Sequence, residues 1–199
     1  MESRKDFFDQ HASSWDAERH YEEQGEHLSR VVESFGLSEG DCVLDVGTGT
    51  GVLLPFMRES IGSRGRLIAM DFSFRMLEEA KQRPFPKTET LINASVEAIP
   101  FQSNEFDEIT CFSSFPHFPN KAKALSEMVR VLKPGGVLWI AHLKSAEEIN
   151  QFHRRVGGPV SQDHLPPPDK LLNLMEDSGL GEVVIVNQPG KFLAKGRKR

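Results

Sequence analysis

The sequence predicts an α/β fold: a doubly wound sheet of seven mostly parallel strands, with helices on both faces. One observation is a short apolar run around Leu44, typical of a strand buried on both faces, which ends in a glycine-rich turn and a helical pattern. Further strand-like segments alternate with amphipathic helical segments as far as residue 143. Two strand-like segments on either side of Gln188-Pro-Gly190 then predict an antiparallel hairpin, with which the C-terminal part of the chain completes the sheet.

Apolar periodicity, caps and turn residues set the expected boundaries. Gly36 suits the carboxyl end of the second helix, and Ser145 with Glu148 forms a capping-box pattern that begins a later one. The expected helices cover residues 3–18, 26–35, 52–61, 73–83, 121–132, 145–155 and 169–178. The expected strands cover residues 43–46, 66–70, 89–93, 106–112, 137–143, 181–187 and 191–196.

Length and composition indicate one domain, residues 1–199, large enough for a three-layer core. The net charge of −5 gives no positive field that would favour nucleic acid, and no apolar run is long enough to span a bilayer. Cys42 and Cys111 lack a metal or disulfide spacing, and the charged N-terminus is no signal peptide, so we expect reduced thiols in a cytoplasmic protein. The basic residues from Lys195 to Arg199 predict a solvated terminus, with an RNA- or phosphate-binding tail as the alternative.

The glycine-rich turn, residues 47–51, follows Asp45 and predicts a nucleotide site. Glycine tolerates positive φ and lets a ligand approach where a Cβ would collide. The spacing is G-x-G-x-G, which differs from the G-x-G-x-x-G fingerprint of dinucleotide-binding proteins. Asp71 stands at the end of the next expected strand, 24 residues beyond Gly47, where it can accept hydrogen bonds from both ribose hydroxyls. The alternative is that Asp71 caps the helix over 73–83.

These motifs resemble those of class I S-adenosylmethionine (SAM)-dependent methyltransferases. CVLDVGTGTG is similar to motif I of that family, and ASVEAIPF to its segment usually written Gly-Asp-Ala-Glu-x-Leu-Pro-Phe. KALSEMVRVLKPGGVLWI resembles the helix, turn and fifth strand of the ubiquinone/menaquinone-biosynthesis group (methyltransferase type 11). The motifs follow the family's order over roughly residues 7 to 143. The resemblance implies a Rossmann-like fold and an enzyme that transfers a methyl group from SAM and releases S-adenosylhomocysteine (SAH).

The resemblance also implies which residues hold SAM. The three glycines would form a floor under its amino-acid end, with Asp45 orienting the loop and Asp71 holding the ribose. Where the family has an acid that meets the adenine amino group, this chain has Ser95, so adenine binding would depend on the Val96 amide. Glu97 follows in the same segment, with its side chain assigned to structure. The implied cofactor-binding set is Asp45, Gly47, Thr48, Gly49, Gly51, Asp71, Phe72, Ser95, Val96, Glu97 and Phe112.

The acceptor side carries fewer signals, because a sulfonium is already a strong electrophile and a general base is optional. His117 and His142 follow strand ends that should face the cofactor, and they are the candidate catalytic bases. FFDQHASSWD resembles the N-terminal lid of small-molecule methyltransferases, so residues 1–36 are expected to form a helical lid; an amphipathic helix on the sheet is the alternative. Residues 144–168 are expected to cover the substrate. The expected substrate-side residues are Trp15, His153, Arg154 and His164.

Other functions stay open. We expect no metal, although His117, His142, His153 and His164, with Asp163, could bind a metal or a metal-bearing substrate. A SAM-fold protein that senses or carries a ligand without methyl transfer is another alternative, because Ser95 replaces the usual acid. A nicotinamide-dependent oxidoreductase is disfavoured by the glycine spacing and the terminal hairpin. The expected acceptor is a small molecule rather than nucleic acid, since the chain lacks an Asp/Asn-Pro-Pro-Tyr motif and an added domain. The acceptor atom and the oligomeric state are not predicted.

Overall fold

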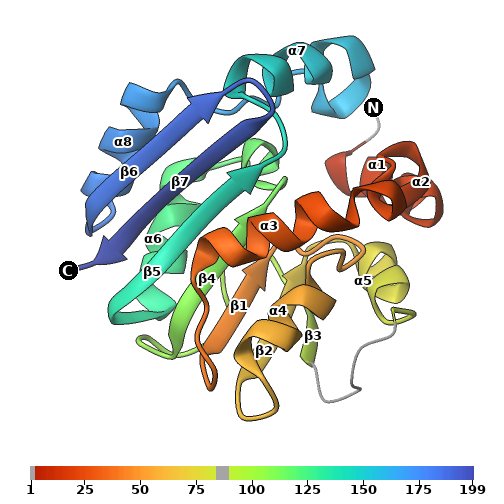
Figure 1. Ribbon diagram of the computed structural model, residues 1–199. Helices are drawn as coiled ribbons and strands as arrows, with labels where there is room; N and C mark the ends of the chain where they lie inside the picture. Colours follow the sequence, from red (N-terminus) through yellow and green to blue (C-terminus); the bar gives the residue numbers. More distant parts are fainter. Residues whose placement is uncertain (1–2, 84–89) are drawn as a thin grey trace.

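A seven-stranded sheet forms the centre of the computed structural model, which describes residues 3–83 and 90–199. The strand order is β3-β2-β1-β4-β5-β7-β6 (Figure 1). Neighbouring strands from β3 to β5 pair in parallel, whereas β7 runs antiparallel between β5 and β6. The strands are β1 (Cys42–Val46), β2 (Arg66–Asp71), β3 (Thr90–Asn93), β4 (Phe106–Phe112), β5 (Leu132–His142), β6 (Leu180–Gln188) and β7 (Lys191–Lys198). The predicted fold class is confirmed.

Helices cover both faces of this sheet (Figure 1). Residues of α3 and α4 share one apolar cluster with one face of the central strands, and residues of α6 and α8 share another with the opposite face. The helices are α1 (Arg4–His11), α2 (Trp15–Glu18), α3 (Gly25–Phe35), α4 (Leu54–Ile61), α5 (Phe74–Ala80), α6 (Lys121–Val131), α7 (Ala146–Val156) and α8 (Pro168–Asp177). Short 3-10 turns are η1 (Ala12–Ser14), η2 (Tyr21–Gln24), η3 (Phe115–His117) and η4 (Gly158–Val160).

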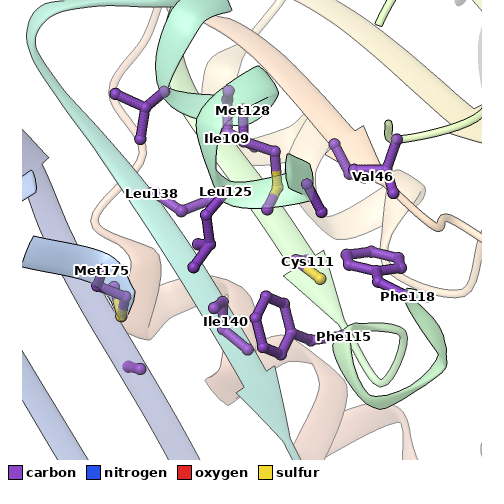
Figure 2. Packing of buried hydrophobic residues seen from close by; sticks show 14 of the residues in the cluster. Val46, Ile109, Cys111, Phe115, Phe118, Leu125, Met128, Leu138, Ile140 and Met175 are labelled. Atoms are coloured by element: carbon purple, nitrogen blue, oxygen red, sulfur yellow. The ribbon is translucent and has the colours of Figure 1, made fainter. Parts of the chain in front are cut away.

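The period-2 alternation of strand side chains divides the core between the two faces. On the α6 face, Ile109 of β4 and Ile140 of β5 pack with Leu125 and Met128 of the helix (Figure 2). The intervening residues point to the α3 and α4 face, where Trp139 lies 5.6 Å from Phe35, measured between ring centroids. Because both faces are covered, the central strands carry apolar residues on both faces, which is why they could be predicted as buried parallel strands.

The N-terminal segment differs from the single helix expected over residues 3–18. It divides into α1, η1 and α2, although Ser3 begins α1 with the capping box that it forms with Asp6. The break falls at a pair of serines, and the Ser14 hydroxyl donates to the His11 carbonyl at 3.3 Å. Serine side chains compete with helical backbone hydrogen bonds in this way, so the helix bends where a continuous one was expected. The bend directs Trp15 toward the carboxyl ends of the strands, where it lines a cavity.

The start of the fifth strand also differs from the prediction. Strand β5 begins at Leu132 rather than at residue 137, because the Lys-Pro-Gly-Gly turn is drawn into the strand through a register shift against β4. Gly136 permits this close approach, since a Cβ there would lie 2.6 Å from the Asp107 carbonyl oxygen. The expected start of the third strand, residue 89, lies outside the described residues. The predicted capping box at Ser145 and Glu148 is confirmed at the start of α7.

The two cysteines are free thiols. Cys111 is buried at the end of β4, and this burial raises the pKa of its thiol to about 12. Such a thiol stays protonated and unreactive at neutral pH. Along the described ranges, no helix has the length and apolar character needed to cross a membrane.

The basic C-terminal residues up to Lys198 are part of β7, and Lys195, Arg197 and Arg199 are exposed there, as expected for a solvated terminus, whereas Lys198 is half-buried. The Lys198 ammonium donates to the Leu132 carbonyl at 2.7 Å, to the Asn104 side-chain oxygen at 2.8 Å and to the Arg130 carbonyl at 3.3 Å. Arg197 pairs with Glu182 and also donates to the Gly135 carbonyl. These cations therefore satisfy backbone groups around the end of α6.

Replacing Lys198 with methionine should lower the free energy of unfolding by about 1–3 kcal/mol, because carbonyls at the end of α6 lose a charged donor. Lys191→Met, at an exposed position of the same strand, is the matched control and should change stability little. Urea denaturation of the two variants measures the difference, and equal midpoints would contradict the role given to Lys198.

Candidate functional site

A cavity of about 680 Å³ lies at the carboxyl ends of β1, β2, β4 and β5. The glycine loop and the residues after β2 line one side of it, and the segment from Phe112 to Pro119 lines another. The N-terminal segment, here residues 3–24, and α7 supply the remaining walls. In an open α/β sheet, this edge is where ligands bind.

The glycine loop is held against the end of β2. The backbone N–H groups of Gly47 and Thr48 both donate to the Met70 carbonyl, at 2.8 and 3.0 Å. Gly47 has a φ of +71°, and a Cβ there would lie 2.4 Å from the Ser114 Cβ. The tight contact explains why this position takes glycine. Gly49 has a φ of +55° with open space around it, so only its backbone conformation favours glycine.

Asp71 joins the loop to β2 and α5. Its Oδ2 accepts the Gly49 N–H at 2.8 Å, and its Oδ1 accepts the Ser73 N–H at 2.8 Å. Burial raises the pKa of the Asp71 carboxyl to about 6. The helix-capping alternative for Asp71 is wrong, because the N-cap of α5 is Ser73, whose hydroxyl accepts the Met76 N–H. Asp71 instead lines the cavity with lone pairs left over for further donors.

Asp45 and Gly51 lie behind the cavity wall. The Asp45 carboxylate is buried and accepts the Thr110 hydroxyl at 2.8 Å, which links β1 to β4. A Cβ on Gly51 would lie 2.8 Å from Leu54 and 3.1 Å from Ala80. The geometry therefore places both residues in support of the loop rather than in contact with the cavity.

Five of the expected cofactor-binding residues also line the cavity: Thr48, Phe72, Ser95, Val96 and Phe112. Glu97 does not, because its side chain turns away and accepts the Asn120 N–H at the start of α6. Of the expected substrate-side residues, Trp15 and His153 line the cavity, whereas Arg154 and His164 are exposed outside it. For Arg154 and His164, the structure contradicts the expected contact with ligand. Glu97 leaves the cofactor-binding set, and its side chain has the structural role expected of it.

His117, His142 and His153 line the cavity together. The part of the cavity around these three histidines is called the acceptor end below. His117 Nδ1 lies 2.8 Å from Asp163 Oδ2, and its ring centroid lies 4.8 Å from that of His153. His153 Nδ1 lies 2.9 Å from the Asp163 carbonyl oxygen. Asp163 is itself paired with Arg4 of α1, whose Nε lies 2.8 Å from Asp163 Oδ1. The sequence thus places the histidines at the site, but carries no local signal for the pairing with Arg4.

Burial keeps these imidazoles neutral. It lowers the pKa of His142 to about 3 and that of His153 to about 4, and neighbouring histidines contribute to both shifts. Burial also lowers the pKa of His117, against the opposing effect of Asp163. Burial alone would raise the pKa of Asp163, but hydrogen bonds from His117 and Arg4 bring it below its ordinary value. The pair is therefore a neutral imidazole beside an ionised carboxylate.

Aromatic residues that the sequence did not single out complete the acceptor end. Phe8 contacts the His117 ring edge to face, with centroids 5.0 Å apart, and Phe152 comes from α7. The Arg19 guanidinium lies 3.5 Å from the centroid of the Trp15 ring. Within the described parts of the chain, no three His, Cys, Asp or Glu side chains are grouped so as to hold a metal ion.

Known proteins resemble the chain along most of its length. A methyltransferase domain model matches residues 44–140. The ubiquinone/menaquinone biosynthesis C-methyltransferase UbiE of Francisella philomiragia is 36% identical over 191 residues, which cover 83% of this chain and 76% of that protein. The chain belongs to the SAM-dependent methyltransferases. The resemblance stated from its motifs is therefore confirmed, and SAM is the cofactor, with SAH as product.

Solved structures agree with this assignment. A SAM-dependent methyltransferase from Aquifex aeolicus has a TM-score of 0.70 at 29% identity, covering 86% of this chain and 89% of that one. A Haloferax volcanii methyltransferase, solved in complex with the Trm112 methyltransferase activator, has a TM-score of 0.78 at 20% identity, covering 99% of this chain and 98% of that one. At that identity the second likeness concerns the fold alone.

The cavity fits SAM. Gly47, Thr48 and Gly49 line the cavity, and the space around Gly49 is open, so a ligand can approach the loop backbone. Asp71 offers unused acceptor lone pairs for ribose hydroxyls. The volume of about 680 Å³ also lies within the range of pockets that enclose small ligands.

Gly47→Ala should destabilise the protein by about 2–3 kcal/mol and abolish stabilisation by SAH, because the new Cβ collides with Ser114 and displaces the loop. Gly40→Ala, at a positive-φ glycine that does not line the cavity, is the matched control. It meets no atom within 4 Å and should cost only about 1–2 kcal/mol for its positive φ. Thermal unfolding with and without SAH measures both effects, and equal losses in the two variants would contradict the contact argued for Gly47.

SAH affinity should fall as the pH drops through about 6, by about tenfold per pH unit, because a protonated Asp71 offers one acceptor fewer to the ribose. Without ligand the sign is reversed: a carboxyl whose pKa is raised on folding loses stability as pH rises from its unfolded pKa to its folded one. Calorimetric titration between about pH 5 and pH 8 measures the affinity. Asp71→Asn should bind weakly at every pH, and a pH dependence that survives in this variant would rule out Asp71 as its source.

Proposed function

We propose that the protein transfers the methyl group of SAM to a small molecule bound at the acceptor end of the cavity, and that His117 takes the proton of the acceptor. The observation that carries this proposal is the environment of His117. Its ring lines the cavity, its Nδ1 is occupied by Asp163, and no described residue hydrogen-bonds its Nε2.

A positioned Nε2 can remove the proton from acceptors that keep it near neutral pH, such as hydroxyls, thiols and activated carbon atoms. When bound, SAM supplies an electrophilic methyl group: the acceptor's electron pair forms the new bond as the C–S bond breaks and SAH leaves. The acceptor's proton passes to His117 Nε2. The adjacent Asp163 carboxylate, 2.8 Å from Nδ1, then stabilises the imidazolium.

His142, the other candidate base, is assigned to the cavity wall. Its Nε2 is buried without a hydrogen-bond partner among the described residues, and its ring packs against Phe192 with centroids 6.0 Å apart. Along the described ranges no carboxylate acts on the ring, so nothing there offsets the cost of charging it. A pKa of about 3 keeps this imidazole neutral through the physiological range.

A small acceptor is supported by the cover over the cavity. Phe8, Trp15 and Phe152 come from the N-terminal segment and α7, so both segments close over the strand ends. Enclosure of this kind excludes water from the reacting groups and leaves little open surface for a macromolecule. We assign residues 3–24 as the lid and the segment that contains Asp163, within the expected range 144–168, as the substrate cover. The lid was expected to extend to residue 36, but α3 instead packs against the sheet through Leu28, Val32 and Phe35.

SAH should stabilise the protein against thermal unfolding by mass action, whereas NAD should not. His117→Ala should retain that stabilisation but lose at least about 100-fold in the rate of SAH formation from SAM with a panel of phenols, thiols and enols, since it removes the base. His27→Ala, at an exposed position on α3, is the control. Stabilisation by NAD alone would overturn the proposed function, and full turnover by His117→Ala would overturn the assigned base.

A further inference from the structure

We propose that Asp163 is a positioning residue that fixes the tautomers of His117 and His153, and that Arg4 makes this arrangement depend on the N-terminal segment. The proposal rests on the proposed function of the same cavity. Its consequence is that the base is complete only when the segment lies over the strand ends.

Asp163 uses all of its acceptor groups on residues from three separate parts of the chain. Arg4 of α1 approaches Oδ1 with Nε at 2.8 Å and Nη2 at 2.5 Å. His117 of η3 approaches Oδ2 at 2.8 Å, and His153 of α7 approaches the main-chain carbonyl at 2.9 Å. The Asp163 side chain is only 2% exposed. A buried carboxylate with this many donors is held in one position.

These contacts determine where the imidazole protons lie. An ionised carboxylate and a carbonyl oxygen only accept hydrogen bonds, so the Nδ1 atoms of His117 and His153 must both carry hydrogen. The Nε2 atoms of both neutral rings are then lone-pair acceptors. The hydrogen bond that one ring nitrogen of a histidine makes commonly determines whether the other nitrogen carries a proton. Both rings line the cavity, so Asp163 gives it two acceptors.

Arg4 is the cation that pairs with this carboxylate from the N-terminal segment. It lies 159 residues from Asp163 in the sequence, at the start of a segment that also supplies Phe8 to the wall. If the segment moves away, Asp163 loses its guanidinium partner, and a carboxylate buried beside neutral rings lacks compensation. The carboxylate would then favour the protonated form of His117. A protonated Nε2 could not take the proton of the acceptor.

The charges around His117 predict opposite effects for the two partners. Asp163 raises the pKa of His117, and Arg4 lowers it. Removing the guanidinium should therefore raise the pKa of His117, while neutralising the carboxylate should lower it. The other titratable or charged groups that act on His117 or Asp163 are Arg19, Lys121, His142 and His153.

Nitrogen-15 NMR of the histidine rings tests the proposal on the full chain with SAH bound, without need of an acceptor. His117→Asn assigns the His117 signals. In the wild type we expect His117 and His153 as neutral Nδ1–H tautomers. Arg4→Gln should raise the pKa of His117, and Arg4→Lys should restore part of the wild-type value. Asp163→Asn should lower that pKa and shift His117 toward the Nε2–H form, while His153 keeps its tautomer because its partner is the main-chain carbonyl.

Arg30→Gln is the matched control, because it removes the same charge. Arg30 lies on α3, and its side chain is 71% exposed. An Nε2–H tautomer of His117 in the wild type, or the same His117 pKa in Arg4→Gln and Arg30→Gln, would overturn the proposal. If Asp163→Asn fails to fold, the Arg4 variants still decide. Failure of SAH to stabilise the wild type would instead remove the proposed function, and the ring spectra would still report the tautomers.

Discussion

The buried carboxylate of Asp71 ties the glycine loop to β2 and to the start of α5, through its bonds to the N–H groups of Gly49 and Ser73. No ion-pair partner for it exists among the described residues, and it is only 6% exposed. Desolvating a charge without a cation is costly, and here only backbone dipoles offset the cost. The loop is thus preorganised, and the remaining desolvation is relieved by any ligand that brings hydroxyl donors.

Asp163 shows the opposite arrangement at the other end of the cavity. It is buried to a similar degree, yet it has a guanidinium on one oxygen and an imidazole on the other. Asp71 lines the cavity and remains able to accept neutral donors from a ligand, whereas Asp163 does not line it and acts through the groups bound to it. Two buried carboxylates at one site therefore differ in role because of their partners and their access to the cavity, and not because of their burial.

Sequence patterns predict the parts of this protein whose causes are local. Strand β4 was predicted with the bounds it has, since its strand-forming residues, such as Ile109, Thr110 and Phe112, can be read without knowledge of its neighbours. The Ser145 capping box also depends only on residues three apart. The break after His11 and the register shift before Val137 were missed, because the first depends on competing serine hydrogen bonds and the second on the fit of one strand against another.

The candidate site divides in the same way. The positions of Asp71 and Gly47 follow from one strand–turn–helix unit and the strand beside it, so motif spacing locates them. The partnership of Arg4 with Asp163 joins residues 159 apart, and neither residue carries a local signal for it. Arg154 and His164 show the converse error, since their types suit a ligand but both are exposed outside the cavity. Sequence spacing fixes neither the direction of a side chain nor a distant partner.

The contacts of the N-terminal segment connect the two ends of the cavity. Asp9 accepts the Ser73 hydroxyl beside Asp71, and Asp16 accepts the Thr50 hydroxyl in the glycine loop, while Arg4 holds Asp163. The apolar part of this attachment is a small cluster around Phe7 and Phe8, separate from the two large clusters of the sheet. Partly exposed polar contacts contribute only about 0.5–1.5 kcal/mol each, so the segment belongs to the least stable part of the fold. A ligand that orders the glycine loop also orders the anchors of the segment, and through Arg4 it stabilises the arrangement of the acceptor-side histidines.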